Sequence, residues 1–428
     1  LVKAIYKAGR RVWEASLFVR LLLALGGVSF FFLGLFMLGM LSVPHGMWDN
    51  TYALLGAVAL TALFVAGSAA RRGWRLELDE LGPYMVLYMA CICIALAGSL
   101  STHLSLRFFA FHVTGFLLVL LAVSSVRKYE QLQLMVSLAV VGISIAALYG
   151  CYQAYIGVDI VPSQQDMAVN AGMPGRVYSF FDNPNNFAEQ LEMLLPLNFA
   201  LFLNCRWRGK VLSLISLGLG LVAIGATYGR ASWIGLALAV VVFLALLDWR
   251  WVPVILVLGV AAIPFLPETI YNRILTIGNS EDSSIQYRFT IYDTTANLME
   301  DYWVRGVGLG SDVMKQVFQT YPTNFDGSYP IHTHNNYLQM WGETGIWGIL
   351  SFLGLLLWQL KRGVKAFLAA PDRRVKRLLA AAIGAFCGIL VIGLAEYTWF
   401  YPRNMFTYWF LFGVIAAGIK LTRTTERS

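Results

Sequence analysis

Long apolar runs constrain this chain more than any other feature of its sequence. The first run, residues 17–42, holds a single charged residue, Arg20, and similar runs recur to the C-terminal region. A helix needs about 20 apolar residues to cross the hydrocarbon core of a bilayer, so each run is long enough for one span. Only 13% of the residues are charged, about half the share that is usual in soluble proteins. The sequence therefore predicts a chain embedded in lipid.

Twelve membrane spans are predicted, with boundaries uncertain by a few residues. They cover residues 17–42, 52–70, 83–100, 107–125, 131–156, 187–205, 210–227, 231–248, 250–266, 337–360, 376–397 and 404–421. The predicted fold class is an all-α polytopic membrane protein of about 12 transmembrane helices, forming a single transmembrane domain over residues 1–428. Residues 267–336, between spans 9 and 10, are predicted to form a loop subdomain inserted in it, with a helical stretch over 286–301.

The basic residues predict the orientation of the spans. If the N-terminus is cytoplasmic, 24 of the 32 lysines and arginines lie inside, and every inner connection carries at least one. This agrees with the positive-inside rule and places both termini in the cytoplasm. The net charge of +8 is then explained by cytoplasmic loops, and no nucleic-acid partner is predicted. The eight basic residues left outside are Arg107, Arg176, Arg230, Arg273, Arg288, Arg305, Lys315 and Arg403.

Arginine makes up seven of these eight outer residues. Its planar guanidinium group can bind two oxygens of a phosphate or carboxylate at once. Arg176, Arg230 and Arg288 stand in polar or aromatic settings, and we expect them to bind a pyrophosphate together. The alternative is that each one only extends to lipid head groups, as single arginines near helix ends often do.

Two histidines mark the outer start of the tenth span. His334 is predicted to be a general base, because a neutral imidazole can accept a proton near neutral pH. His332 is a weaker candidate, and Asn335 and Tyr337 follow as supporting residues. The alternative is a polar cap at the membrane interface. No metal is predicted, because no nearby cysteine or carboxylate completes a set of four ligands.

Five carboxylates lie near the outer face, and ionisable groups within spans are functional candidates because they are costly there. They are Asp182, Glu189, Glu192, Glu343 and Glu396. Glu343 follows His334 by about two and a half helical turns. We expect it to support the site as the partner of an arginine in a buried ion pair, rather than to act on substrate.

The motifs around these residues resemble those of the O-antigen ligase family, which includes O-antigen polymerases and protein O-oligosaccharyltransferases. His334-Asn335 is followed after nine residues by Gly345-Ile346-Trp347-Gly348, which resembles the family signature. Two further segments, one with Gly175-Arg176 and Asp182-Asn183-Pro184-Asn185-Asn186 and one with Gly229-Arg230-Ala231-Ser232-Trp233, are similar to other family patterns.

This resemblance implies a glycosyltransferase that works without a metal or other cofactor. It implies transfer of a glycan from undecaprenyl pyrophosphate to the lipid A–core oligosaccharide, at the periplasmic face of a bacterial inner membrane. Together with the chemistry above, it predicts that His334 deprotonates the acceptor hydroxyl and that the three arginines bind the pyrophosphate. Asn335 and Tyr337 would orient the histidine or the sugar, and direct displacement would invert the anomeric carbon.

Other functions stay open at the level of sequence. An O-antigen polymerase would use the same donor with another lipid-linked glycan as acceptor, and a protein O-glycosyltransferase would use a protein. A transporter or flippase of an anionic lipid-linked glycan is the alternative from a different class. It is less favoured, because the unusual arginines gather at one face and do not follow a path through the membrane.

Overall fold

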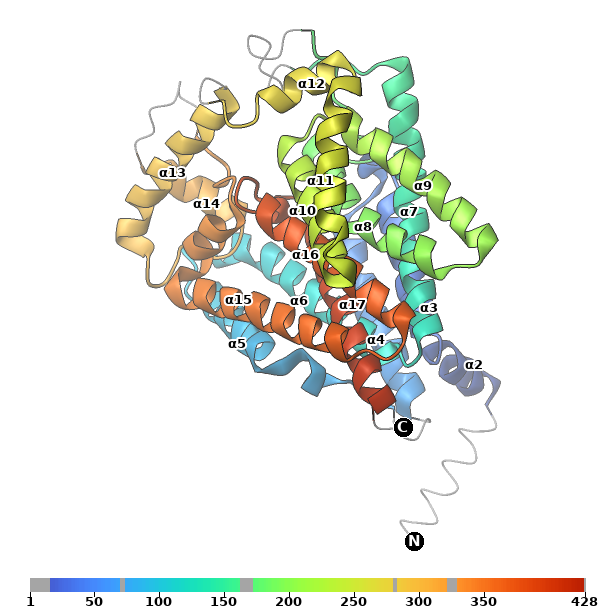
Figure 1. Cartoon of the computed structure of the whole chain (residues 1–428). Helices are drawn as coiled ribbons and strands as arrows, with labels where there is room; N and C mark the ends of the chain where they lie inside the picture. The colour runs from blue at the N-terminus through green and yellow to red at the C-terminus, as the bar shows by residue number, and fades with distance from the viewer. Residues whose placement is uncertain (1–15, 70–73, 162–171, 280–282, 322–328, 427–428) are drawn as a thin grey trace.

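The computed structural model describes residues 16–69, 74–161, 172–279, 283–321 and 329–426. This part of the chain is helical and contains no strand, which confirms the predicted all-α class (Figure 1). Seven basic residues used in the orientation argument lie outside the described residues: Lys3, Lys7, Arg10, Arg11, Arg71, Arg72 and Arg427.

Each predicted span overlaps a helix, although the first is divided between two helices and the helix of the tenth continues to Ala369. The main helices are α2 (Leu17–Gly26), α3 (Ser29–Ser42), α4 (Asn50–Ala69), α5 (Leu78–Ala97), α6 (Thr102–Ser125), α7 (Tyr129–Ile156), α8 (Pro184–Asn204), α9 (Trp207–Ala226), α10 (Arg230–Asp248), α11 (Trp251–Ala262), α12 (Glu268–Leu275), α13 (Ser283–Tyr302), α14 (Ser311–Phe318), α15 (Asn336–Ala369), α16 (Arg373–Ile392) and α17 (Pro402–Glu426). The described residues also contain the short 3₁₀ segments η1 (His45–Met47), η3 (Ile263–Phe265) and η4 (Thr398–Phe400).

The number of spans differs slightly from the predicted twelve. Nine helices of the described chain are long and apolar enough to cross a membrane, and two bent pairs raise the total to at most eleven. The first pair is α2 with α3, bent by 66°, and the second joins α11 to α12 with a bend of 120°. The remaining predicted span corresponds to α8, which is less apolar because it carries Glu189, Gln190, Glu192 and Asn198.

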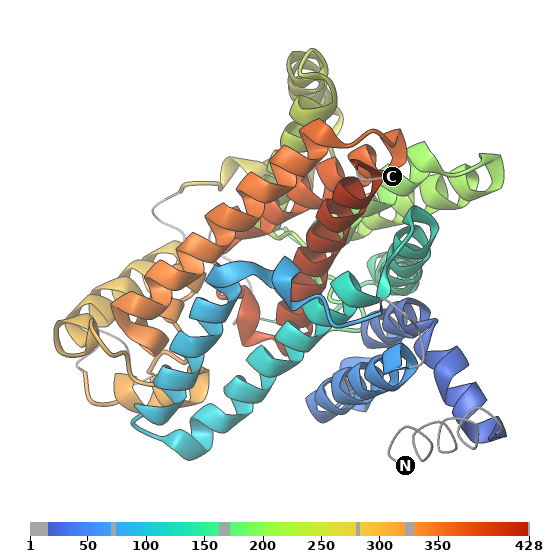
Figure 2. The ribbon, with the colours of Figure 1, turned by 90° about the horizontal axis from the view of Figure 1, so that it is seen from below.

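Helix α17 forms the centre of the helical bundle (Figure 2). Its large aromatic side chains, Trp409 and Tyr408 among them, are buried against neighbouring helices. Around it, α16 packs closely on α10, because Gly384 has no Cβ, and one there would lie 2.5 Å from the carbonyl oxygen of Ala239. Small residues commonly allow membrane helices to approach in this way.

Helices α13 and α14 lie beside the start of α15, on one side of the bundle (Figure 1). They share a second, smaller hydrophobic core formed by Leu298, Met299, Val307, Val313, Met314, Val317 and Phe318. The helical stretch predicted over 286–301 is confirmed, since it lies within α13. The subdomain predicted over residues 267–336 stays a prediction.

Helix α15 is broken at Gly345, one of the glycines of the family motif. Its φ is 68°, in the left-handed region, and a Cβ there would lie 2.0 Å from the carbonyl oxygen of Val304. The break lets the segment after α13 pair with α15: the Val307 backbone N–H donates to the Gly342 carbonyl at 2.8 Å. Glycine suits this position because it alone adopts such a conformation at little cost. The motif glycine therefore fixes the segment after α13 against the helix that follows His334.

Candidate functional site

The carboxylate of Glu396 is the central group of the candidate site. Glu396 lies in the connection between α16 and α17 and is buried. One of its oxygens, Oε1, forms an ion pair with Arg288 from α13 and accepts a hydrogen bond from Asn185 Nδ2 at 3.2 Å. The other, Oε2, lies 3.3 Å from His334 Nδ1. Three segments that are distant in sequence therefore converge on one carboxylate.

The pKa of Glu396 reflects these partners. Burial by itself would raise this pKa, but the positive charge of Arg288 and the hydrogen bond from His334 outweigh burial and lower the pKa to about 2. The carboxylate is therefore ionised at any pH at which the protein is expected to work. An ionised carboxylate beside Nδ1 favours the tautomer in which Nδ1 carries the proton, and this leaves Nε2 free to accept one.

Arg176 joins this centre through Asn185. Its Nη2 donates to Asn185 Oδ1 at 2.5 Å, and its Nε donates to the Thr227 carbonyl oxygen at 2.7 Å. Asn185 also belongs to the first turn of α8, where its backbone N–H donates to Asn183 Oδ1, the N-cap. The cap fixes the start of α8, so Asn185 is held between Arg176 and Glu396.

Arg230 and Arg273 complete a group of four arginines. Arg230 is the first residue of α10, and its Nη1 donates to the Thr276 carbonyl oxygen at 2.9 Å. Arg273, on α12, is buried, and its Nε donates to the Tyr228 carbonyl oxygen. The backbone of the α9–α10 and α12 segments thus holds both guanidinium groups in place.

The four guanidinium groups influence one another. Burial, and then the charge of Arg273, lower the pKa of Arg176 to about 9; Arg230 and Arg288 act in the same direction and Glu396 opposes them. Arg176 still stays protonated at neutral pH. So much positive charge beside a single carboxylate suits a ligand with several negative charges. The structure brings Arg176, Arg230 and Arg288 together, as the sequence predicted, and adds Arg273.

His334 has an unusual backbone conformation. Its φ is 49°, in the left-handed region that residues with a side chain seldom adopt. Its backbone N–H donates to His332 Nδ1 at 3.2 Å, and the Tyr292 hydroxyl donates to its carbonyl oxygen at 3.4 Å. Such conformations cost on the order of 1–3 kcal/mol and occur most often at functional sites. Here the conformation directs the imidazole towards Glu396.

His332 is the less suitable base of the two histidines. Its ring packs 4.2 Å from the ring of His334 and 4.6 Å from that of Phe400, measured between centroids. Burial, and then the nearby His334, lower its pKa to about 3. A group with so low a pKa is neutral at working pH but a poor proton acceptor. His332 instead supports the backbone of His334.

Asn335 and Tyr337 have structural contacts. Asn335 Oδ1 accepts from the backbone N–H groups of Tyr337 and Leu338, which makes Asn335 the N-cap of α15. Its Nδ2 donates to the Leu394 carbonyl oxygen at 2.9 Å, and the Tyr337 hydroxyl donates to that of Leu390 at 2.7 Å. Within the described residues, neither side chain hydrogen-bonds to the His334 ring. They position His334 through the backbone, by holding the start of α15 against α16.

Glu343 does not form the expected ion pair with an arginine within the described chain. Its Oε1 accepts hydrogen bonds from Gln339 Nε2 at 2.8 Å and from the Tyr397 hydroxyl at 3.2 Å. Neutral donors replace the expected guanidinium group, because no arginine of the four reaches this turn of α15. Since Tyr397 directly follows Glu396, the contact helps to fix the segment that carries Glu396.

From the sequence, Glu396 is one of five candidate carboxylates and Arg273 is one of eight basic residues predicted outside, and neither is singled out as a site residue. No local motif separates Glu396 from the other carboxylates, because its partners lie 62 residues away at His334 and 108 away at Arg288. Within the described residues, no group of three or more His, Cys, Asp and Glu side chains could hold a metal ion. That the reaction needs no metal stays a prediction.

The fold and the site define a class: a polytopic all-α membrane protein with a cluster of arginines, a carboxylate and a histidine contributed by helices and by the connections between them. Residues 211–353 match the family model described as O-antigen ligase, which confirms the resemblance to this family. The matched region contains Arg230, Arg273, Arg288 and His334. The match supports a glycosyltransferase of the O-antigen ligase or polymerase type that acts on lipid-linked glycans in a membrane.

Other comparisons add little. No curated protein sequence matches the chain. One solved structure, from work entitled "Structural coordination of polymerization and crosslinking by a peptidoglycan synthase complex", is similar with a TM-score of 0.45 and 16% identity. That alignment covers 79% of this chain and 97% of the other. A likeness at this level supports no conclusion about function.

Proposed function

We propose that this protein is an O-antigen ligase of the bacterial inner membrane. It transfers a glycan from undecaprenyl pyrophosphate to a lipid A–core oligosaccharide at the periplasmic face, by metal-independent inverting displacement. Both termini lie in the cytoplasm in this proposal. Support comes from the family match and from the site geometry, above all from the contact between His334 Nδ1 and the Glu396 carboxylate.

His334 acts as the general base in this proposal. With its Nδ1 proton directed to Glu396, Nε2 accepts the proton of the acceptor sugar hydroxyl. The hydroxyl oxygen then forms a bond to the anomeric carbon of the donor. The bond between that carbon and the pyrophosphate oxygen breaks, and its electron pair leaves with the pyrophosphate. Glu396 stabilises the imidazolium that forms, as a carboxylate does for the histidine of serine proteases.

The arginines bind the leaving group. Lipid pyrophosphate gains negative charge as the glycosidic bond breaks, and guanidinium groups placed in advance stabilise that charge. Arg176, Arg230 and Arg273 each donate to a backbone carbonyl oxygen. These contacts orient the guanidinium groups, whose planar geometry suits phosphate oxygens. Arg288, which pairs with Glu396 in this structure, links the phosphate-binding group to the base.

Product analysis after reconstitution tests this function. The purified protein in nanodiscs is mixed with lipid-linked O-antigen and lipid A–core, and products are separated by gel and mass spectrometry. Lipid A–core that carries the glycan is expected, also with EDTA present. Extension of lipid-linked glycan instead would indicate a polymerase. Movement of the donor across liposome membranes without any transfer would indicate a flippase, and either result would overturn the proposal.

A further inference from the structure

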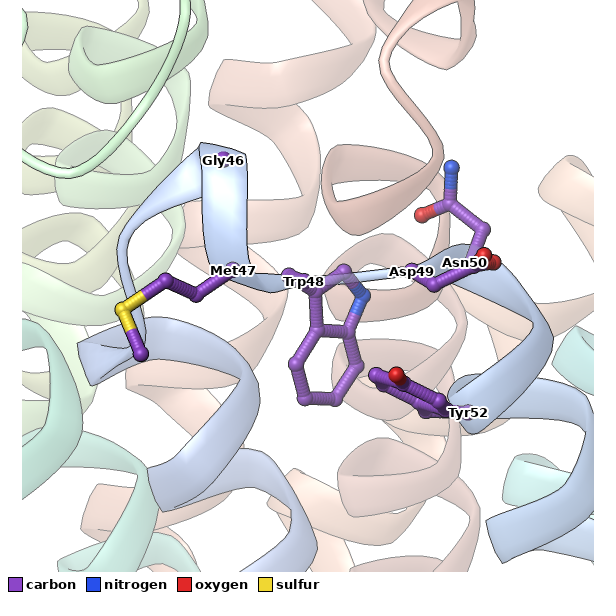
Figure 3. A pocket seen from close by; sticks show the side chains of 6 residues that line it. All are labelled: Gly46, Met47, Trp48, Asp49, Asn50 and Tyr52. Atoms are coloured by element: carbon purple, nitrogen blue, oxygen red, sulfur yellow. The ribbon is translucent and has the colours of Figure 1, made fainter.

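A pocket of about 350 Å³ lies in the connection between α3 and α4, outside the arginine site (Figure 3). It is lined by Gly46, Met47, Trp48, Asp49, Asn50 and Tyr52. The rings of Trp48 and Tyr52 meet edge to face, with centroids 6.1 Å apart. Its size lies near the lower end of the roughly 300–1,000 Å³ that small-ligand pockets occupy. One or two sugar rings fit such a volume.

The polar groups of the pocket are a carboxylate and an amide, from Asp49 and Asn50. Asp49 Oδ1 accepts the Thr51 backbone N–H at 2.7 Å, and this hydrogen bond lowers the pKa of Asp49. The pocket therefore carries a negative charge, and its lining includes no lysine or arginine. A phosphate group would be repelled here. Hydroxyl groups would be favoured, because they can donate to a carboxylate and can both donate to and accept from an amide.

A buried cation packs against the Trp48 ring. Arg403, at the start of α17, is fully buried, and its Cζ lies 5.1 Å from the centre of the Trp48 ring. Its Nη1 donates to the Val43 carbonyl oxygen at 2.7 Å. Phe36 also contacts the indole, edge to face. Cation–π and aromatic contacts of this kind fix the ring in place, so the aromatic wall exists before a ligand arrives.

The pocket is joined to the two segments that carry the site. The His45 backbone N–H donates to the Phe180 carbonyl oxygen at 2.8 Å, and Phe180 lies four residues after Arg176. The His45 ring nitrogen Nδ1 lies 3.2 Å from the Tyr401 hydroxyl, and Tyr401 follows Glu396 by five residues. The segment that carries the pocket is therefore packed, through His45, against the segments that follow Arg176 and Glu396 in the chain.

We propose that this pocket is a second binding site, for a pyranose ring of a glycan substrate at a distance from the reacting bond. The apolar C–H face of the sugar packs on Trp48 and Tyr52, and its hydroxyl groups bind Asp49 and Asn50. The ring belongs either to the glycan of the donor or to the acceptor oligosaccharide. This inference rests on the proposed function, because it takes the substrates to be long glycans.

Steady-state kinetics distinguish the two sources. Transfer is measured in nanodiscs while donor and acceptor are varied in turn, for Trp48→Ala, Tyr52→Ala and Asp49→Asn. Losing an aromatic contact of about 0.5–1.5 kcal/mol should raise one KM by roughly three- to tenfold and leave kcat unchanged. A raised donor KM assigns the pocket to the donor glycan, and a raised acceptor KM assigns it to the acceptor. Unchanged KM values in all three variants would overturn the inference.

A matched control separates sugar binding from membrane anchoring, which exposed tyrosines and tryptophans commonly provide. Tyr155, at the C-terminal end of α7, is 89% exposed and lines no part of this pocket. Tyr155→Ala should therefore keep both KM values. If it raises them as much as Tyr52→Ala does, the aromatic side chains act as anchors and the pocket has no sugar ligand.

A direct binding measurement tests the inference without depending on catalysis. O-antigen glycan and core oligosaccharide, each freed of lipid, serve as probes in saturation-transfer NMR with the protein in nanodiscs. Transfer to one probe that is lost in Tyr52→Ala and kept in Tyr155→Ala supports the pocket. Such binding supports the pocket even if the protein shows no transferase activity. In that case the proposed function is wrong and the binding site stands. No binding of either probe to the unmodified protein would overturn the inference.

Discussion

Replacing Glu396 with glutamine removes one negative charge from the site and keeps the size of the side chain. The native carboxylate is buried and receives an ion pair from Arg288, a hydrogen bond from Asn185 and the contact with His334 Nδ1. Glutamine can still accept from some of these donors. It cannot stabilise a protonated imidazole by charge, so the substitution acts mainly on the step in which His334 takes up a proton.

The expected effect follows from the contacts of that carboxylate. Losing one charge-directed contact in a site of this kind costs about 2–4 kcal/mol in the transition state. The value of kcat should therefore fall roughly 30- to 1,000-fold, with KM less affected.

The assay is transfer to lipid A–core in nanodiscs, with kcat and KM measured across a pH series. Thermal unfolding of Glu396→Gln is followed in parallel, so that a loss of folded protein is not taken for a loss of chemistry. Asp301→Asn provides a control, since this exposed carboxylate lies near the C-terminal end of α13, whereas Arg288 lies near its start, and accepts from the Tyr321 hydroxyl. A kcat for folded Glu396→Gln within threefold of the native value would refute the role of Glu396.

The other predictions concern the arginines, the base and the pH dependence of stability. Arg273→Ala should lower kcat/KM about 30- to 1,000-fold, because one cation that stabilises the leaving group is lost. Arg305→Ala changes an exposed arginine and should keep the native kcat/KM in the same transfer assay; if the two variants have equal kcat/KM, Arg273 does not belong to the site. His334→Ala should reduce kcat by roughly 10²–10⁴-fold, as loss of a general base does, and full activity would sink that assignment. Folding lowers the pKa of Glu396 from 4.5 to about 2. The ionised carboxylate therefore stabilises the folded protein above pH 4.5, and this stabilisation is lost as the pH falls towards 2. Thermal melts at a series of pH values should show this loss in the native protein and much less of it in Glu396→Gln.

Much of the fold could be predicted because lipid imposes one simple condition. Each span must be apolar and helical, so the helices can be read from runs of apolar residues. The exception, α8, shows the limit of this rule. Its polar residues are shielded by neighbouring helices, and Asn404 of α17 donates to Glu189 at 2.5 Å. Apolar composition alone cannot distinguish a lipid-facing span from a helix enclosed by others.

The candidate site could be predicted only in part. The motifs located His334, and the excess of outer arginines located Arg176, Arg230 and Arg288. No sequence pattern favours Glu396 over Glu343, since both are acidic residues predicted near the outer face. In the structure, Glu343 contacts Gln339 and a tyrosine, whereas Glu396 contacts the histidine and an arginine.

The sequence by itself determined the helices, the class of protein and the types of residue available for chemistry, because these depend on local composition. Only the tertiary structure decided which charges meet. Arg288 reaches Glu396 because α13 packs beside the start of α15, and that packing depends on the break at Gly345. Pairing among buried charges is set by contacts between segments far apart in the chain, and no local pattern specifies it.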